Sequence, residues 1–497
     1  YEVRGSLFIY SQKNLNNMQK RLQLLLALLV FVVTSAMAQI TTSGISGKIS
    51  SNDETVIGAT VTATHQPSGT VYRAVTNVDG RYTIQGMRPG GPYKVSISYI
   101  GYKDKVFNNV SLSLGETENI SCSLQEDAHQ LQEVVVAGKA GLAASRTGAA
   151  TSMTAEQINN MPSITHGIAD VARLNPQLTV TNSGNMSFAG TNNRYNNFMI
   201  DGAANNDVFG LASSGNNGGQ AGAQPVSMET IEQIQVSVAP FDVRQSGFTG
   251  GAINAITKSG TNKFHGSAYY YGYNQDLIGT KYPYLDGTGY APKYQKQTQY
   301  NMGVTLGGPI IKNKLFFFAN YERTNKEYPN LYGVDSGNSK VNTEQAKDIL
   351  TMLQKMAEKQ GVAFNDYFSN QDIYTKSDKA GLKLDWNINE FNKFAIRWSL
   401  VKAEQLSGGG SASSLNSYGY SYPFKSNTNS FIAELQSRIS PNVSNEARVS
   451  FVRVRDSRDI KANLPMISIT GVGSGTVNIG TERNSQANYL NQDIWTI

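Results

Sequence analysis

Histidine is the side chain most able to bind zinc or to transfer protons near neutral pH, and the sequence contains four of them. A zinc site or a catalytic triad requires several such groups to converge. The four histidines fall in four different segments, at His65, His129, His166 and His265. This distribution supports neither kind of site, so we expect no enzyme, no metal site and no cofactor.

Three further features resemble chemical sites, but each has a simpler structural explanation. Asp79 could join His65 in binding a metal, and Asp201 could act as a catalytic carboxylate. Both aspartates precede a glycine, which is typical of a turn. Gly250 and Gly251 could suggest a phosphate-binding loop, but the sequence has no Gly-x-x-x-x-Gly-Lys-Ser/Thr motif. We expect these two glycines to lie in a strand pressed against the backbone of a surrounding barrel.

The segment with the clearest binding chemistry is Leu131-Gln132-Glu133-Val134-Val135-Val136. Its valines have high β propensity, and the segment lies between two predicted domains. An isolated strand of this kind can pair with the exposed sheet edge of another protein. The alternative is that the segment forms the last strand of the domain that precedes it.

The composition of the 497-residue chain limits the classes of protein to which it can belong. Its 47 glycines and 26 tyrosines suit many turns and amphipathic strands. The mean hydropathy of −0.34 excludes a bundle of membrane helices. The formal charge of +6 includes no basic cluster, so we expect no nucleic-acid partner. The single cysteine, Cys122, cannot form an internal disulfide.

The first 38 residues predict export from the cytoplasm. The basic residues Lys20 and Arg21 are followed by an apolar run at 22–33. The small residues Ala36 and Ala38 then precede a cleavage point before Gln39. This order is typical of a secretory signal peptide that is cleaved before Gln39. The apolar run is shorter than the ~20 residues that a membrane-spanning helix needs. We expect residues 1–17 to lie upstream of a natural start at Met18.

The remaining chain divides into four predicted parts. Residues 40–125 contain short alternating strands at intervals of about 8–12 residues, which is typical of a small β-sandwich. Residues 126–150 form a linker that contains the valine-rich segment. Residues 151–260 mix helix and strand signals, as in an α+β domain. Residues 261–497 predict the first part of a transmembrane antiparallel β-barrel.

The barrel prediction rests on alternation and on loop lengths. Apolar and polar side chains alternate along strands of about ten residues, as expected when one face meets lipid and the other a lumen. Examples are Leu382, Leu384 and Trp386 against Lys383 and Asp385, and Phe394, Ile396 and Trp398 against Ala395 and Arg397. The predicted connections are alternately long and short: 275–296, 307–313, 323–380, 389–392, 402–427, 440–442 and 455–484. Such alternation suits a barrel with two different faces.

Three details of this barrel remain as expectations. About eight strands are recognisable, fewer than the roughly 22 of plugged transporters, so we expect a C-terminally truncated fragment. A helix is predicted at Thr343–Lys359, either as part of an outer lid or as a packed loop decoration; its apolar face comprises Ile349, Leu350, Leu353 and Met356. Five tyrosines suit either an interfacial girdle or cross-strand packing, namely Tyr269, Tyr270, Tyr271, Tyr273 and Tyr321.

Several segments resemble known families. Residues 58–102, "GATVTATHQPSGTVYRAVTNVDGRYTIQGMRPGGPYKVSISYIGY", are similar to the carboxypeptidase regulatory-like domain. The valine-rich segment resembles the TonB box, because it lies just ahead of a sequence that resembles the plug of TonB-dependent receptors. The plug resemblance lies in the order and spacing of Thr154–Ile158, Gly167–Pro176, Phe198–Gly202, Ile231–Val236 and Phe248–Lys258, and Leu306–Arg323 resembles the Oar-like branch.

The resemblance implies a TonB-dependent outer-membrane receptor of the Oar-like or SusC-like kind, with its N-terminal domain in the periplasm. Its fold would be mainly β, comprising a sandwich, an α+β plug and a partial barrel surrounded by outer-membrane lipid. Such a receptor binds a nutrient or chelate outside the cell and imports it with inner-membrane energy. Residues 131–136 would bind a TonB-type energy-coupling protein, and a surface lipoprotein is a candidate partner. The substrate is not identified, and the alternative is a surface adhesin or structural protein.

Overall fold

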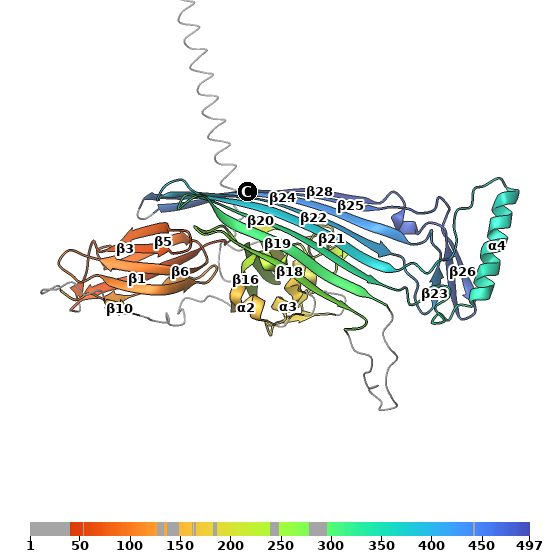
Figure 1. Ribbon diagram of the computed structural model, residues 1–497, viewed down its shortest axis with the longest axis horizontal. Coiled ribbons are helices and arrows are strands. Elements are labelled where there is room, and N and C mark those ends of the chain that lie inside the picture. Colours follow the sequence, from red (N-terminus) through yellow and green to blue (C-terminus); the bar gives the residue numbers. More distant parts are fainter. Residues whose placement is uncertain are drawn as a thin grey trace, which may run out of the picture.

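The computed structural model describes residues 40–497 except 53, 127–133, 137–148, 162, 164–165, 182–185, 239–247, 278–295 and 441–442 (Figure 1). Strands dominate this part of the chain and form a sandwich, a central mixed domain and a large curved sheet. Among these residues no helix has the length and apolar character needed to cross a membrane. The predicted cleavage residues Ala36, Ala38 and Gln39 lie outside the described residues, as do Leu131, Gln132 and Glu133.

The N-terminal domain is a sandwich of two sheets around one apolar core. In one sheet β1 (Ser43–Ser51) pairs with four strands, β2 (Glu54–Thr55), β5 (Arg81–Met87), β8 (Thr117–Asn119) and β9 (Cys122–Ser123). The order in the other is β10 (Val134–Val136), β7 (Lys105–Leu112), β6 (Gly90–Ser98), β3 (Thr60–His65) and β4 (Thr70–Val75). Alternate residues of β3, Val61 and Ala63, are fully buried, which confirms the alternation expected of a half-buried strand.

The central domain is built on a mixed five-stranded sheet with two short helices. Its order is β11 (Ala149–Thr154), β16 (Ile231–Val238), β17 (Gly251–Thr257), β14 (Asn197–Ile200) and β15 (Ala203–Ala204), and its helices are α2 (Ala155–Asn160) and α3 (Ile168–Ala172). Thr154 is the N-cap residue of the first helix. The Thr154 backbone N–H donates to the Gln157 side chain at 3.0 Å, and the Gln157 N–H donates to the Thr154 hydroxyl at 3.4 Å. This reciprocal pair satisfies backbone donors that the helix itself leaves free.

Eight antiparallel strands form the large curved sheet, and β18 and β28 are its edge strands. In order they are β18 (His265–Asn274), β19 (Thr298–Ile311), β20 (Leu315–Tyr328), β21 (Ile373–Asn387), β22 (Asn392–Ser407), β24 (Tyr422–Ser440), β25 (Val443–Arg458) and β28 (Tyr489–Thr496). The strands reach 19 residues in β24. The expected length of about ten was too short for the six strands from β19 to β25, and the predicted connections 323–380 and 402–427 were too wide, since the observed intervals are 329–372 and 408–421.

The two faces of the curved sheet differ as the alternation predicts. Leu382 and Trp386 are 43% and 42% exposed on the outer face, although they are large and apolar. Their neighbours Lys379 and Lys383 are buried on the opposite face. Apolar side chains outside and charged side chains inside are the arrangement of a membrane barrel.

The three bodies are arranged along the sheet (Figure 1). The central domain lies against one face of the sheet, the sandwich lies at one end, and helix α4 (Thr343–Lys359) lies beyond the other end. The tight connections between β19 and β20 and between β21 and β22 face the sandwich, because Asn387 and Glu390 contact it directly. The long connections therefore lie at the end that carries α4.

Three long connections fold together into a small outer subdomain. It contains α4 and a sheet of β23 (Ser414–Asn416), β27 (Gly475–Ile479) and β26 (Ile467–Val472). Leu350 of the helix packs in a core with Leu415, Val477 and Ile479. The helix bounds match the prediction. Ile349, Leu350 and Leu353 of the predicted apolar face pack in this core, whereas Met356 of the same face is 57% exposed. Of the two interpretations of the helix, packing within a folded loop cluster agrees with these contacts.

Candidate functional site

Asp201, directly after β14, is a buried charged group at the boundary between the central domain and the curved sheet. Its φ of 48° places it in the left-handed region, in a turn with Gly202, which agrees with the predicted Asp-Gly turn. The carboxylate accepts a hydrogen bond from the Thr257 backbone N–H at 2.8 Å and from the Thr257 hydroxyl at 2.6 Å. These two bonds fix the carboxylate against the end of β17.

Two cations of the curved sheet meet the same carboxylate. The Arg397 guanidinium lies 3.2 Å from Asp201, and the Lys383 ammonium lies 3.7 Å away. Lys383 also donates to the Thr257 carbonyl at 3.1 Å. Burial alone would raise the pKa of Asp201, but both cations and the Thr257 hydrogen bonds lower it below its ordinary value. Asp201 is therefore held as a buried anion that joins the central domain to the sheet.

A second buried charge pair lies on neighbouring strands of the sheet. Glu322 of β20 lies 2.5 Å from Lys379 of β21, and both side chains are less than a tenth exposed. Glu322 also accepts from the Ser227 hydroxyl at 2.6 Å and from the Tyr269 hydroxyl at 2.8 Å. Because Ser227 belongs to the central domain, this pair forms a second link between that domain and the sheet.

Tyr269 and Tyr271 face the central domain rather than a lipid boundary. The Tyr269 hydroxyl donates to Glu322, and the Tyr271 hydroxyl donates to Glu229 of the central domain at 3.0 Å. The girdle interpretation was therefore wrong for these two residues. Tyr270 points the other way, being 67% exposed, and its ring stacks on Tyr300 at a centroid distance of 6.0 Å.

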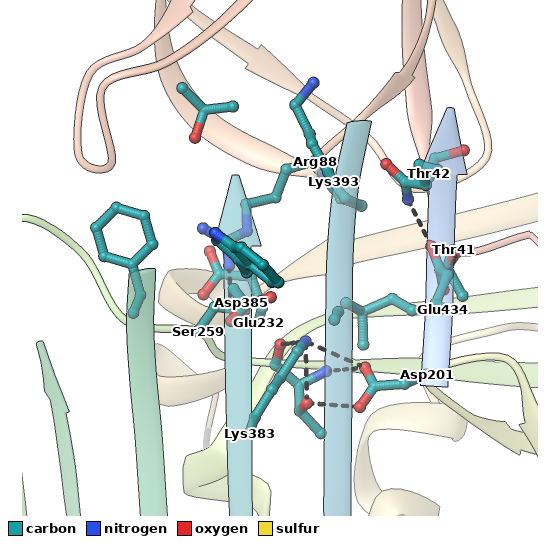
Figure 2. Close-up of a pocket in the computed structure, with 18 of the residues that line it drawn as sticks. Thr41, Thr42, Arg88, Asp201, Glu232, Ser259, Lys383, Asp385, Lys393 and Glu434 are labelled. Atoms are coloured by element: carbon teal, nitrogen blue, oxygen red, sulfur yellow. Dashed lines mark hydrogen bonds and ion pairs between the residues drawn. The ribbon is translucent and has the colours of Figure 1, made fainter. Parts of the chain in front are cut away.

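A cavity of about 190 Å³ lies where the sandwich, the central domain and the sheet meet (Figure 2). Each body contributes charged lining residues. Arg88 comes from the sandwich, Asp201 and Glu232 from the central domain, and Lys383 and Asp385 from the sheet. The cavity thus carries both signs of charge. Within the described part of the chain, no cluster of three His, Cys, Asp or Glu side chains is arranged to hold a metal.

The structure describes the second half of the valine-rich segment, Val134–Val136, and these residues form a strand. Val134, Val135 and Val136 form β10, which pairs in parallel with Lys105, Val106 and Phe107 of β7. The segment therefore extends the sandwich sheet at its edge. This pairing is the alternative considered from the sequence, and it leaves the other edge of β10 without a neighbouring strand among the described residues.

The remaining candidates from the sequence have structural roles. Asp79 lies in a turn whose Asn77 side chain accepts from the Asp79 and Arg81 backbone N–H groups. The His65 ring is buried, lies 2.7 Å from the Ser68 hydroxyl, and has its pKa lowered to about 3 by burial and by Arg88. Burial raises the pKa of the Cys122 thiol to about 11.

Gly251 at the start of β17 and Gly250 just before it pack closely against other parts of the central domain. A Cβ on Gly251 would lie 2.3 Å from the Phe188 ring, and one on Gly250 would lie 2.4 Å from the Asn196 side chain. Close packing therefore explains them, as predicted. The neighbour was wrong, since both contacts lie within the central domain and not against barrel backbone.

Sequence comparisons divide the chain at the same places as the fold. A profile described as the carboxypeptidase regulatory-like domain matches residues 44–125, and one described as the TonB-dependent receptor plug domain matches residues 143–253. An outer membrane beta barrel domain profile matches residues 256–334 and 335–493. The central domain is therefore the plug, and the curved sheet is part of the barrel wall.

Curated relatives belong to the same class. The chain is 29% identical over 273 residues to the TonB-dependent transporter Oar of Myxococcus xanthus, covering 52% of this chain and 24% of that protein. It is 25% identical over 188 residues to the probable TonB-dependent siderophore receptor PirA of Acinetobacter baumannii, covering 35% and 22%. The crystal structure of PirA aligns at a TM-score of 0.47 and 16% identity, over 70% of this chain and 44% of that one.

The chain belongs to the TonB-dependent receptors. It is an outer-membrane protein with an N-terminal regulatory-like sandwich on the periplasmic side, and its relationship to Oar agrees with the Oar-like features of its sequence. The matched region spans about a quarter of the length of the curated relatives.

Proposed function

We propose that the protein binds a nutrient or chelate outside the cell and imports it with energy supplied from the inner membrane. The observation that carries this proposal is the buried contact between Asp201 of the plug and Arg397 of the wall. A plug fastened from inside blocks passive passage through a barrel. Passage then requires the fastening to be broken, and a buried ion pair is costly to break.

We further propose that a TonB-type energy-coupling protein binds residues 131–136. The partner would pair with the edge of β10 that no described strand occupies, since strand addition supplies affinity through backbone hydrogen bonds. Three residue pairs join β10 to β7, so the added strand would extend the sandwich sheet. Leu131, Gln132 and Glu133 would lengthen the paired strand.

The substrate class stays open between ferric siderophores, cobalamin, glycans and peptides. The name of the PirA relative refers to a siderophore, but that relative shares only a part of this chain. We propose that the protein has no catalytic role, because the matched family consists of transporters and receptors. Outer-membrane lipid around the barrel and a surface lipoprotein are the further partners that we propose.

Uptake in living cells tests the transport proposal. The full-length protein is expressed in a strain that lacks it, and uptake of labelled ferric siderophores, cobalamin, glycans and peptides is measured with and without a proton-motive uncoupler. A deletion of Glu133–Val136 is expected to abolish energised uptake while leaving surface binding intact. An adhesin would keep its activity in the deletion variant and would show no uptake of any of these compounds.

A further inference from the structure

The sandwich contacts both the plug and the barrel wall, and the two sets of contacts differ in kind. We propose that the sandwich and the plug move as one mechanical unit during transport, and that the sandwich separates from the wall. This inference rests on the proposed function, because it concerns which bodies move when the receptor is energised.

The contact between the sandwich and the plug is made by buried amides on one plug strand. The Gln233 side chain accepts from the Leu114 backbone N–H at 2.8 Å and donates to the Leu112 carbonyl at 3.0 Å. Gln235, two residues along β16, donates to the Leu114 carbonyl at 2.8 Å. Gln233 is 1% exposed while the sandwich is in place, so its hydrogen bonds lie in an interface that excludes water. Hydrogen bonds shielded from water are stronger than exposed ones, and separating the sandwich from the plug would break all three together.

An apolar contact and a third amide complete this interface. Ile40 and Leu114 form one buried cluster with Ile256 of the plug. The Asn254 side chain of the plug donates to the Ile40 carbonyl at 2.5 Å. Apolar burial and buried amide hydrogen bonds together resemble a domain core, and separating such surfaces would expose apolar area to water.

The contacts between the sandwich and the wall are mainly polar, and several lie near solvent; the Arg88–Asp385 ion pair is 23% and 19% exposed. The Arg73–Glu390 pair is about half exposed on both sides, and exposed pairs of this kind contribute little. The Asn387 amide donates to the Thr70 hydroxyl at 2.9 Å and also to the Asn313 carbonyl at 3.0 Å. It therefore keeps a partner if Thr70 leaves.

A more buried link to the wall joins Thr41 to an ion pair that the wall already contains. The Thr41 hydroxyl contacts Glu434 at 3.0 Å and accepts from Arg448 at 2.7 Å. Arg448 and Glu434 are themselves paired at 3.1 Å, so the two wall residues still neutralise each other without Thr41. Separation from the wall therefore leaves the Arg448–Glu434 pair intact, whereas separation from the plug breaks the buried amide hydrogen bonds and exposes an apolar cluster.

The position of the coupling strand is consistent with this unit. Because β10 pairs with β7 of the sandwich, a pull on β10 loads the sandwich before it loads the plug. The sandwich then transmits the load through Gln233 and Gln235 to β16. The wall contacts, which lie at the periplasmic turns, yield first.

Two reversible disulfides in the full-length protein test the proposal, both in a Cys122→Ser background. Leu114→Cys with Ile256→Cys ties the sandwich to the plug. Thr70→Cys with Asn387→Cys ties the sandwich to the wall. Disulfide formation is checked by mass spectrometry, and energised uptake of the compound that the parent receptor imports is measured before and after reduction.

We expect the sandwich–plug disulfide to leave uptake unchanged and the sandwich–wall disulfide to abolish it until it is reduced. Loss of uptake with the sandwich–plug disulfide, or full uptake with the sandwich–wall disulfide, overturns the proposal. If Leu114→Cys disturbs folding, Ile40→Cys with Ile256→Cys replaces it, since the three residues share one cluster. Absence of energised uptake in the unmodified parent would instead overturn the proposed function.

Discussion

The carboxylate of Asp201 in the plug lies 3.2 Å from the guanidinium of Arg397 in the barrel wall, and both side chains are buried. The two residues are far apart in the sequence and belong to different domains. Lys383 and Thr257 complete the environment of this carboxylate. The arrangement fastens the plug to the inner face of the wall at a point that water reaches poorly.

Asp201→Asn should weaken the attachment of the plug by about 3–5 kcal/mol, because removing one partner leaves buried cations uncompensated. Denaturant unfolding of the purified full-length receptor measures the change. Glu390→Gln is the matched control, because it removes a carboxylate from the exposed Arg73 pair and should cost no more than about 1 kcal/mol. Equal stability of the two variants would show that the buried pair does not fasten the plug.

Gly251→Ala should destabilise the plug by about 1–3 kcal/mol through overpacking. The added Cβ would meet the Phe188 ring at 2.3 Å, and this ring is fully buried. Adding Phe188→Leu to Gly251→Ala should recover part of the loss, while Phe188→Leu alone should be destabilising. Thermal unfolding of the four proteins gives the coupling, and simple additivity of the two changes would contradict the proposed clash.

Asp366 should be the residue on which the outer subdomain most depends. Its carboxylate accepts from the Ser417 hydroxyl at 2.5 Å and from the Gly419 and Gly480 backbone N–H groups at 2.6 Å, so it joins all three long connections. Asp366→Asn should lower the stability of the outer subdomain by roughly 2–3 kcal/mol, because three hydrogen-bond donors then lose their charged acceptor. Limited proteolysis should then cut the outer connections faster, whereas the exposed Asp335→Asn should leave the cleavage rate unchanged.

His65 should make the sandwich sensitive to acid. Its folded pKa of about 3 lies below the ordinary 6.5, so below pH 6.5 the unfolded chain binds a proton that the folded domain does not. Stability should therefore rise as the pH increases from 3 to 6.5 and then level off, with a slope of at most roughly 1.4 kcal/mol per pH unit. Denaturant unfolding of residues 40–126 measures this slope. His65→Gln should remove it, and an unchanged slope in that variant would assign the effect to other groups.

The parts of the fold that the sequence predicts best are those set by local periodicity. Alternation along β21 placed Leu382 outside and Lys383 inside, because the side-chain period of a strand is two. The helix at residues 343–359 was predicted with its observed bounds, since its apolar spacing and its flanking residues agree. Loop ends were predicted less well, because strands such as β24 continue beyond the stretch of regular alternation.

Long-range partners could not be predicted in the same way. Asp201 was correctly expected in a turn, but its pairing with Arg397 depends on how β22 is aligned in the wall. The close contact between Gly251 and Phe188 could not be predicted for the same reason. Nothing in the sequence around Phe188 indicates that its ring packs on this glycine. The alternation along β22 does place Arg397 on the inner face of the wall. A charge on that face needs a partner of opposite sign, so the sequence indicates that a partner exists but does not identify it.

The most direct test is a reversible tether between plug and wall. Ala223 of the plug and Ala403 of the wall lie in one buried cluster, and Ala223→Cys with Ala403→Cys in a Cys122→Ser background should join them without touching the Asp201 pair. Energised uptake by the full-length receptor is measured with the disulfide formed and again after reduction. We expect uptake to be lost in the oxidised protein and restored by reduction, whereas full uptake with the disulfide intact would contradict a plug that must leave the wall.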